Sequence, residues 1–305
     1  MSKIFIGFLV YNGERFLSKA LDSLRVQSYT DWKIYISDDA STDGTAEICK
    51  QYAREDDRII YYRQEKNIGL YGNYKFLIDR ADCPYFMWAC HDDLWEKDFL
   101  KVCVEQLEKD NGVGIAMTGI ANIDSRGNVV REIPKFALLS GKPNFITVSR
   151  FLLQPEIFGK CMIMCGIFRT EAIRNAWNIY PQRPESGSDY IFALAAVSHY
   201  GVGINPRVLF KKRMGGISDS QNNRRDGEMI VIIEPKNYMF SVGGGRFGRC
   251  LKNSLRAVTG TPYKPLVFCI LMMRSIRAWI LFFKTRNYRK RMQKIIPDSI
   301  LKRVS

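Results

Sequence analysis

The sequence predicts an α/β fold in which a mainly parallel central sheet is flanked by helices. Short apolar runs that suit buried strands alternate, over the first third of the chain, with segments whose apolar positions have helical spacing. Strands joined by helices of about a dozen residues form parallel, right-handed crossover units. Polar residues follow several of these strands, and open parallel sheets bind ligands beyond the carboxyl ends of their strands.

This first third supplies four strands and three helices. Turn and cap residues at Ser41–Gly44 open the second helix, and Asn67–Gly69 is expected to form a loop. The expected strands are Ile4–Val10, Trp32–Ser37, Ile59–Tyr62 and Tyr85–Ala89, and the expected helices are Glu14–Gln27, Thr45–Arg54 and Asn73–Asp79.

The stretch Tyr85–Trp95 begins as an apolar strand and then turns abruptly polar at His91, Asp92 and Asp93. Adjacent carboxylates just beyond a buried strand repel each other where water is scarce. A divalent cation removes this cost, and hard ions such as Mg²⁺ or Mn²⁺ prefer carboxylate oxygen. The alternative is a solvated turn in which both acids face water.

Two charged residues in the less regular region that follows have both a functional and a structural interpretation. Asp189 precedes the apolar helix Tyr190–His199, where the helix dipole favours a carboxylate that can simply act as a cap. Arg213 follows the strand Val208–Phe210 and either reaches phosphates or lies in a solvated basic loop. The other expected elements are a helix at Leu100–Lys109, a strand at Gly114–Thr118, a hairpin turn at Asn122–Asn128 and a helix opening at Arg169–Glu171.

The charge of the chain is strongly asymmetric. The net charge is +15 over 305 residues, but residues 1–205 carry a net charge of −2 and residues 206–305 a net charge of +17. No acidic residue lies between Pro235 and Pro297. This distribution predicts an anionic partner for the last third of the chain, either nucleic acid or an anionic membrane surface.

The segment Leu266–Phe283 has the character of a helix that lies in a membrane interface. Its longest uninterrupted apolar piece is shorter than the roughly 20 residues of a spanning helix. Helical spacing places Arg274, Arg277 and Lys284 on one face, and the cluster Lys284–Lys294 adds six basic residues in total and no acid. A helix packed on the catalytic domain, or across a dimer, is the alternative.

The cysteines and the N-terminus predict a cytoplasmic protein. The eight cysteines are scattered without a Cys-x-x-Cys pattern, and Cys161-x₃-Cys165 has no partner pair for zinc. Met-Ser-Lys leads directly into the first strand without the features of a signal peptide. We therefore expect reduced thiols.

The ordered series of polar motifs resembles the family-2 inverting glycosyltransferases, which have the GT-A fold. The resemblance covers about residues 3–215, and the run Asp38–Thr45 is its most specific part. The matching motifs are Tyr11-Asn12-Gly13-Glu14, Asp38-Asp39-Ala40-Ser41-Thr42-Asp43-Gly44-Thr45, Asn67-x-Gly69, His91-Asp92-Asp93-x-Trp95, Phe168-Arg169 and Ser188-Asp189.

The resemblance implies a role for each matching residue. Asp93 would bind the metal that bridges the diphosphate, Asp92 would lie beside it toward the sugar and ribose, and Asp189 would be the catalytic base. The residues that we expect at the nucleotide are Leu9, Tyr11, Glu14, Asp39, Asn67, Gly69, Asp92 and Arg213. Many relatives carry a further Asp where this chain has Cys90, and a thiol is a poor ligand for Mg²⁺ or Mn²⁺.

These inferences predict a metal-dependent, inverting glycosyltransferase that builds a cell-surface polysaccharide. Residues 1–215 would form the catalytic domain, with a nucleotide-binding half at about 1–95 and an acceptor half at 96–215. Residues 216–305 would form a basic helical region that binds the inner face of the cell membrane. The implied partners are a nucleotide-diphosphate sugar, with UDP favoured, a saccharide acceptor that a lipid carries, Mn²⁺ or Mg²⁺, and an anionic membrane, and no nucleic acid is expected.

Three other interpretations fit the sequence less well. The pattern Gly243-x-Gly245-x-x-Gly248 has no strand–helix–strand unit around it and lacks the later acid of a dinucleotide site. A nucleic-acid-binding protein would use the basic last third but leaves the strand-end acids unexplained. A nucleotidyltransferase would need a glycine-rich basic phosphate loop, which Phe8–Glu14 does not contain.

Overall fold

The fold is taken from a computed structural model, which describes residues 2–154, 159–179, 188–214 and 246–273. Nine strands lie within these residues. They are β1 (Ile4–Val10), β2 (Trp32–Asp38), β3 (Ile59–Arg63), β4 (Tyr85–Cys90), β5 (Leu94–Trp95), β6 (Val113–Ile123), β7 (Val129–Glu132), β8 (Ile167–Arg169) and β9 (Gly201–Arg213).

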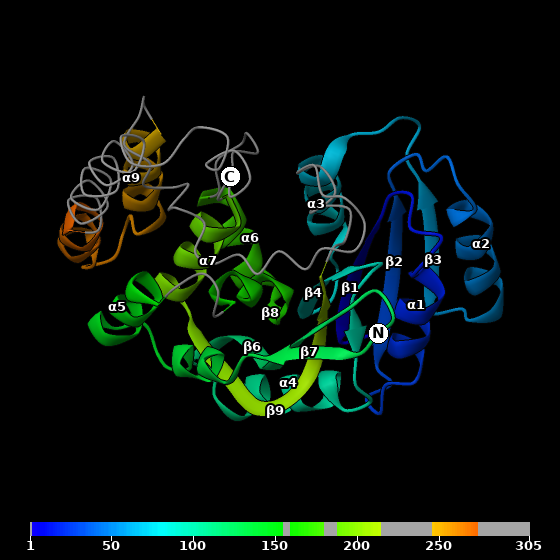
Figure 1. Ribbon diagram of the computed structural model, residues 1–305, viewed down its shortest axis with the longest axis horizontal. Helices are drawn as coiled ribbons and strands as arrows, with labels where there is room; N and C mark the ends of the chain where they lie inside the picture. The colour runs from blue at the N-terminus through cyan, green and yellow to red at the C-terminus, as the bar shows by residue number, and fades with distance from the viewer. Residues whose placement is uncertain (1, 155–158, 180–187, 215–245, 274–305) are drawn as a thin grey trace, which may run out of the picture.

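Helices connect and cover these strands. The α-helices are α1 (Leu17–Arg25), α2 (Thr45–Glu55), α3 (Gly69–Arg80), α4 (Phe99–Lys109), α5 (Phe145–Leu153), α6 (Thr170–Ile179), α7 (Ser188–His199) and α9 (Arg246–Ala257), and the 3₁₀ helices are η1 (Pro134–Leu139) and η3 (Lys160–Cys165). A further helix covers residues 264–273. Figure 1 shows α1 and α2 at one end of the molecule and α5 and α9 at the other, with the curved strand β9 between them.

The nine strands form one sheet with the order β3-β2-β1-β4-β8-β6-β9-β5, and β7 pairs with β6. β1 runs parallel to β2 and β4, and β2 runs parallel to β3, as predicted for the first third of the chain. The later part of the sheet is mixed, because β8 is antiparallel to both β4 and β6 while β9 is parallel to β6. The predicted α/β architecture is confirmed.

Several boundaries differ from the prediction. The first helix begins at Leu17 rather than Glu14, since the Gly13 carbonyl accepts hydrogen bonds in a turn first. The third helix already begins at Gly69, where we expected a loop. β9 has 13 residues because it pairs with β6 over most of its length.

The buried aromatic side chain of Trp88, in β4, packs against residues of three helices. Its ring lies 5.5 Å from Phe86, 4.7 Å from Tyr74 of α3, 5.5 Å from Trp177 of α6 and 5.4 Å from Phe192 of α7, measured between centroids. Aromatic pairs at these distances add to the free energy that burial already supplies. The strand that leads into the acid pair is therefore anchored from several elements.

The helix at residues 264–273 packs on the protein through Val267, Ile270 and Leu271, which are buried. This part of the segment that we expected in a membrane interface thus follows the packing alternative. Arg274, Arg277 and the cluster Lys284–Lys294 lie outside the described residues. Within the part of the chain that the structure describes, no helix is both long enough and apolar enough to cross a membrane.

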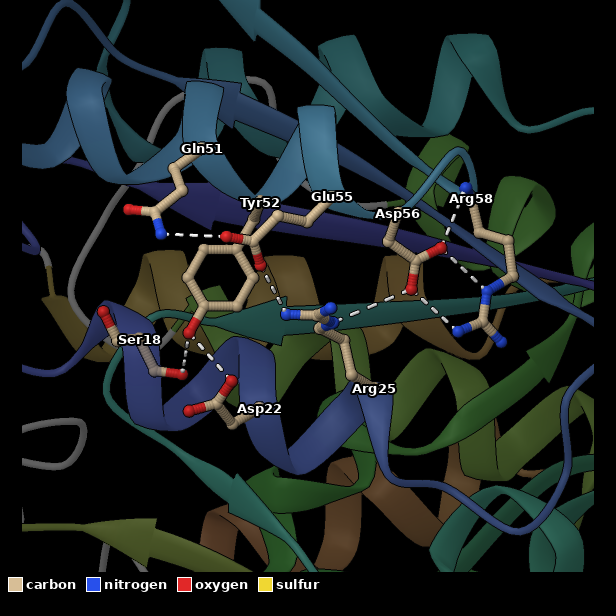
Figure 2. A network of polar contacts seen from close by, with 8 residues as sticks. All are labelled: Ser18, Asp22, Arg25, Gln51, Tyr52, Glu55, Asp56 and Arg58. Atoms are coloured by element: carbon tan, nitrogen blue, oxygen red, sulfur yellow. Dashed lines mark hydrogen bonds and ion pairs between the residues drawn. The ribbon is translucent and has the colours of Figure 1, made fainter.

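A polar network holds α1 against α2 and the chain that follows it (Figure 2). The Tyr52 hydroxyl donates to Asp22 Oδ1 at 2.8 Å, while Arg25 pairs with Glu55 at 3.1 Å and with Asp56 at 3.8 Å. Burial, followed by the hydrogen bond to Asp22, raises the pKa of Tyr52 to about 12. The neutral phenol is therefore the form that the folded state favours.

Replacing Tyr52 by Phe should lower the free energy of unfolding by about 1 kcal/mol at pH 7.5, because the hydrogen bond to Asp22 is lost. The folded-state pKa of Tyr52 lies above the unfolded value of about 10, so this contribution is complete below pH 10 and is lost as the pH rises through the folded-state value. Urea unfolding of both proteins from pH 7.5 to 11.5 measures the difference. A difference that stays constant over this range would contradict the assignment.

Candidate functional site

The strand register places the ends of three parallel strands side by side. Val10 of β1 pairs with Asp38 of β2, and Leu9, whose side chain is buried, pairs with Cys90 of β4. The residues that follow these strands carry most of the predicted site, and they consequently share one edge of the sheet. This is the edge at which open parallel sheets bind ligands.

The two acids at the end of β2 have different partners. Asp38 is buried, and its carboxylate accepts hydrogen bonds from Ser41 N–H at 2.9 Å and from the Tyr61 hydroxyl at 2.8 Å. Asp39 is also buried and accepts from Ile68 N–H at 2.7 Å. Burial raises the pKa of Asp39 above its usual value, and the Ile68 N–H partly opposes this shift.

The segment Asn67–Gly69 lies against Asp39 through this bond. Asn67 Oδ1 accepts from Gly69 N–H at 3.0 Å, and Gly69 has a φ of +75°, which glycine adopts without a steric penalty. A Cβ at Gly69 would meet no atom within 4 Å, so this side of the backbone faces open space. The structure thus brings together three residues that the sequence analysis placed at the nucleotide.

The loops Tyr11–Glu14 and Ser41–Thr45 are interlocked beside them. Asn12 of the first loop and Ala40, just before the second, have positive φ values of 48° and 60°, which residues other than glycine rarely adopt. Six hydrogen bonds join the loops, and the four shortest are Asn12 N–H to Ser41 Oγ (2.9 Å), Thr42 N–H to Asn12 Oδ1 (2.8 Å), Gly13 N–H to Thr45 Oγ1 (2.8 Å) and Gly44 N–H to Glu14 Oε2 (3.0 Å).

This interlock assigns a structural task to Glu14, whose carboxylate positions the second loop through Gly44. A contact between Glu14 and a nucleotide stays a prediction. Tyr11 is 37% exposed at the rim of the same edge. Gly13 must be glycine, because a Cβ there would lie 2.7 Å from Cδ2 of His91.

Asp92 and Asp93 are buried, at 7% and 1% exposure, so the alternative of a solvated turn is wrong. Asp93 Oδ1 accepts from Arg213 N–H at 3.1 Å, and Asp93 Oδ2 pairs with Lys212 Nζ at 3.2 Å. Burial raises the pKa of Asp93 above its usual value, while the Lys212 ammonium opposes the rise. In the part of the chain that the structure describes, no hydrogen bond reaches the carboxylate of Asp92.

Arg213 does not lie in a solvated basic loop, since it is 4% exposed. Its Nε donates to the Asp92 carbonyl at 2.9 Å, a second guanidinium nitrogen donates to the Asp124 carbonyl, and the guanidinium lies 4.3 Å from the ring centroid of Phe16. These contacts hold the acid turn against the β6–β7 hairpin. A contact between Arg213 and phosphates stays a prediction.

No motif in the sequence singled out Lys212, the cation that faces Asp93. Strand alternation could have identified it, because neighbouring residues of a strand point to opposite faces. Lys211 pairs with Glu96, while Lys212 points toward Asp93. The expected strand stopped at Phe210 and therefore did not include either lysine.

Cys90, Asp92 and Asp93 could hold a metal ion, because one ligand atom from each lies within 4.8 Å of the others. The two carboxylates suit Mg²⁺ or Mn²⁺. Burial raises the pKa of Cys90 well above its usual value, so its sulfur stays protonated and is a weak ligand. The residues fit a divalent cation bound mainly by oxygen.

Asp189 lies at the N-terminus of α7, and its Oδ1 accepts from Tyr190 N–H at 2.9 Å, in keeping with a capping role. Burial raises the pKa of Cys165 to about 12, and Lys212, Asp92, Asp93 and Asp189 all act on this thiol electrostatically. These charged residues come from elements far apart in the sequence. The role of Asp189 as the catalytic base stays a prediction.

Comparison with known proteins places these features in a family. Residues 6–175, more than half of the chain, match the sequence profile described as "Glycosyl transferase family 2". The chain is 34% identical over 105 residues to glycosyltransferase GlyA of Streptococcus pneumoniae, a match that covers 34% of this chain and 15% of GlyA. It is 34% identical over 153 residues to the dTDP-rhamnosyl transferase RfbG of Shigella flexneri, covering 48% of each chain. The chain thus spans less than half the length of these relatives.

The fold resembles that of TarS from S. aureus. The crystal structure of TarS residues 1–349 with UDP superposes with a TM-score of 0.62 at 14% identity, covering 88% of this chain and 70% of that one. The complex of the same protein with UDP-GlcNAc gives a TM-score of 0.61 at 15% identity, covering 89% and 72%. These likenesses confirm the GT-A fold.

The family match supports the glycosyltransferase interpretation and gives no support to the nucleic-acid-binding alternative. The order of motifs along the chain, the sheet edge that collects them and the profile match over residues 6–175 agree with one another. The chain belongs to glycosyl transferase family 2.

Proposed function

We propose that the protein transfers a sugar from a nucleotide-diphosphate donor to a hydroxyl of a saccharide acceptor, with inversion, in the synthesis of a cell-surface polysaccharide. The observation that carries this proposal is the shared sheet edge, where Asp39, Asp92 and Asp93 follow the ends of the neighbouring strands β2 and β4. The names of two relatives, a dTDP-rhamnosyl transferase and a chondroitin synthase of Escherichia coli that is 29% identical over 182 residues, support a nucleotide-linked donor and a saccharide product.

The donor's nucleotide would occupy the space between the interlocked loops and Asn67–Gly69. Asp39, together with the backbone near Leu9 and Tyr11, would hold the base, and the open side of Gly69 leaves room for it. UDP is the favoured diphosphate, in line with the UDP complexes of TarS. Glu14, Asn67 and Arg213 would act mainly by positioning the backbone around the donor.

Asp92 and Asp93 would hold a divalent cation. A Mg²⁺ or Mn²⁺ ion bound there would supply Lewis-acid stabilisation of the diphosphate leaving group. Arg213 holds the buried turn, because its backbone N–H donates to the Asp93 carboxylate and its Nε donates to the Asp92 carbonyl. Because the turn is already fixed, the site needs little reorganisation when negative charge develops on the leaving group.

Asp189 would be the base that accepts the proton of the acceptor hydroxyl as the new bond forms. The carboxylate approaches from α7, whereas the acids for the cation come from the turn after β4. Base and leaving group on opposite sides of the sugar produce inversion. We assign residues 1–215 to this catalytic domain, with the donor in the half at about 1–95 and the acceptor in the half at about 96–215.

Residues 216–305 would bind the inner, anionic face of the cell membrane, where a lipid-linked acceptor is available. The support for this is the net charge of +17 over residues 206–305. Exposed Phe268 and Met273 on the helix at residues 264–273 add apolar surface beside the basic region.

Calorimetry with UDP, GDP and TDP, with and without Mn²⁺, tests the donor site. We expect one diphosphate, UDP, to bind in a Mn²⁺-dependent way, and Asp93→Asn to weaken this binding by at least about tenfold because a hard ligand is lost. Asp79→Asn, in an exposed pair with Lys75, is the matched control and should bind as the wild type does. Binding of UDP that is unaffected by both Mn²⁺ and Asp93→Asn would refute the assignment.

Asp189→Asn should leave the Kd for UDP unchanged and lower the rate of UDP release from UDP-sugars, in the presence of a saccharide acceptor, by about 100-fold or more. The reason is that an amide cannot accept the hydroxyl proton. Glu171→Gln, an exposed acid in the first turn of α6, is the control for a helix N-terminus. Turnover of Asp189→Asn within tenfold of the wild-type value would remove Asp189 as the base.

Reversal of three charges, Arg289→Glu, Lys290→Glu and Arg291→Glu, in the full chain should abolish flotation with vesicles that contain an anionic lipid, because the attraction between the basic cluster and the headgroups is lost. Vesicles of neutral lipid measure the part of the binding that does not depend on charge. Equal flotation of the variant and the wild type with anionic vesicles would contradict the membrane proposal.

A further inference from the structure

We propose that Lys212 is an internal cation that competes with a divalent metal ion for Asp93, so that the free protein binds metal weakly and the donor promotes metal binding. This inference rests on the proposed function, because it concerns the same diphosphate site. It adds a residue that neither the family resemblance nor the sequence pattern assigned. The contact that carries it is the pair between Lys212 Nζ and Asp93 Oδ2, at 3.2 Å.

The two oxygens of Asp93 have partners of different kinds. Oδ1 accepts from the backbone N–H of Arg213, at 3.1 Å, within the paired end of β9. Oδ2 is held by a side chain, the Lys212 ammonium. The carboxylate can therefore exchange its partner at Oδ2 while Oδ1 keeps it in place.

The contacts of the two neighbouring cations differ in number. The Lys212 side chain is 24% exposed and its ammonium pairs with Asp93, whereas Arg213 is buried and its guanidinium donates to the carbonyls of Asp92 and Asp124. Withdrawal of Arg213 would break the contacts that shape the acid turn. Withdrawal of Lys212 breaks one ion pair and leads toward solvent along a flexible four-carbon stem.

Electrostatic repulsion prevents the Lys212 ammonium and a divalent metal ion from binding Oδ2 of Asp93 together. An ammonium at 3.2 Å already neutralises Asp93, and a divalent ion on the same carboxylate would be repelled by that ammonium. Metal binding must therefore displace Lys212. Breaking the ion pair between Lys212 and Asp93 costs free energy, and this cost weakens the binding of the metal. A donor diphosphate offers the displaced ammonium another anionic partner, so donor and metal binding become coupled, each strengthening the other.

Titration of the protein with Mn²⁺ alone, followed by electron paramagnetic resonance of free Mn²⁺, measures the competition without catalysis. Lys212→Met should bind Mn²⁺ at least about tenfold more tightly than the wild type, because its competitor is gone. Lys212→Arg keeps the charge and should bind as weakly as the wild type. Lys211→Met is the matched control, since Lys211 pairs with the partly exposed Glu96 on the other face of β9, and its Mn²⁺ affinity should be unchanged.

The coupling with the donor gives a second readout. UDP should raise the Mn²⁺ affinity of the wild type by a larger factor than that of Lys212→Met, because in the variant no ammonium has to be displaced. Thermal unfolding of each variant verifies that it is folded. If Lys212→Met does not fold, Lys212→Gln, which retains an N–H donor for Asp93, takes its place in both titrations.

Mn²⁺ affinity of a folded Lys212→Met or Lys212→Gln that equals the wild-type value would overturn the inference. This failure is distinguishable from failure of the proposed function. If the protein binds UDP with Mn²⁺ and transfers sugar but its Lys212 variants gain no Mn²⁺ affinity, the proposed function stands and the competition by Lys212 is refuted. If the Lys212 variants gain Mn²⁺ affinity but the protein binds none of the three diphosphates, the competition stands and the proposed donor site is refuted.

Discussion

Burial of the Asp93 carboxylate is the constraint on which the candidate site depends. A carboxylate that is 1% exposed is tolerated only when hydrogen bonds and an opposite charge compensate for the lost water. Both come from the last two residues of β9, which reach the turn because β9 pairs with β6 and with β5. The second half of the chain therefore makes the acid pair of the first half possible, and the two halves share one sheet.

Each of the two acid pairs, Asp38-Asp39 and Asp92-Asp93, contributes both to the fold and to the candidate site. In the first pair, Asp38 organises the loop after β2 through Ser41 and Tyr61, while Asp39 reaches the backbone before α3. In the second pair, Asp93 is held by the end of β9, while no hydrogen bond within the described residues reaches the Asp92 carboxylate. Asp38, Asp39 and Asp93 are thus held by hydrogen bonds to other elements of the protein, in two of the three cases to backbone N–H groups far along the chain.

The success of the fold prediction has a local cause. Each strand of the first third is a short apolar run bounded by polar turn residues, so its existence and its polar end are visible without knowledge of its neighbours. The later strands are short or mixed in composition, and their lengths follow from pairing. β8 has three residues between β4 and β6, and β9 extends to Arg213 because β6 pairs with it that far.

The sequence by itself determined the α/β class, the strands that lead to the acids and the residues that gather at one sheet edge, because these depend on local hydrophobic pattern and motif order. Only the tertiary structure decided the partners of those residues. Lys212 faces Asp93, Arg213 binds backbone carbonyls and Glu14 holds the opposite loop, since each contact joins elements that lie far apart along the chain. The state of a buried charge depends on such distant partners, and no local pattern encodes them.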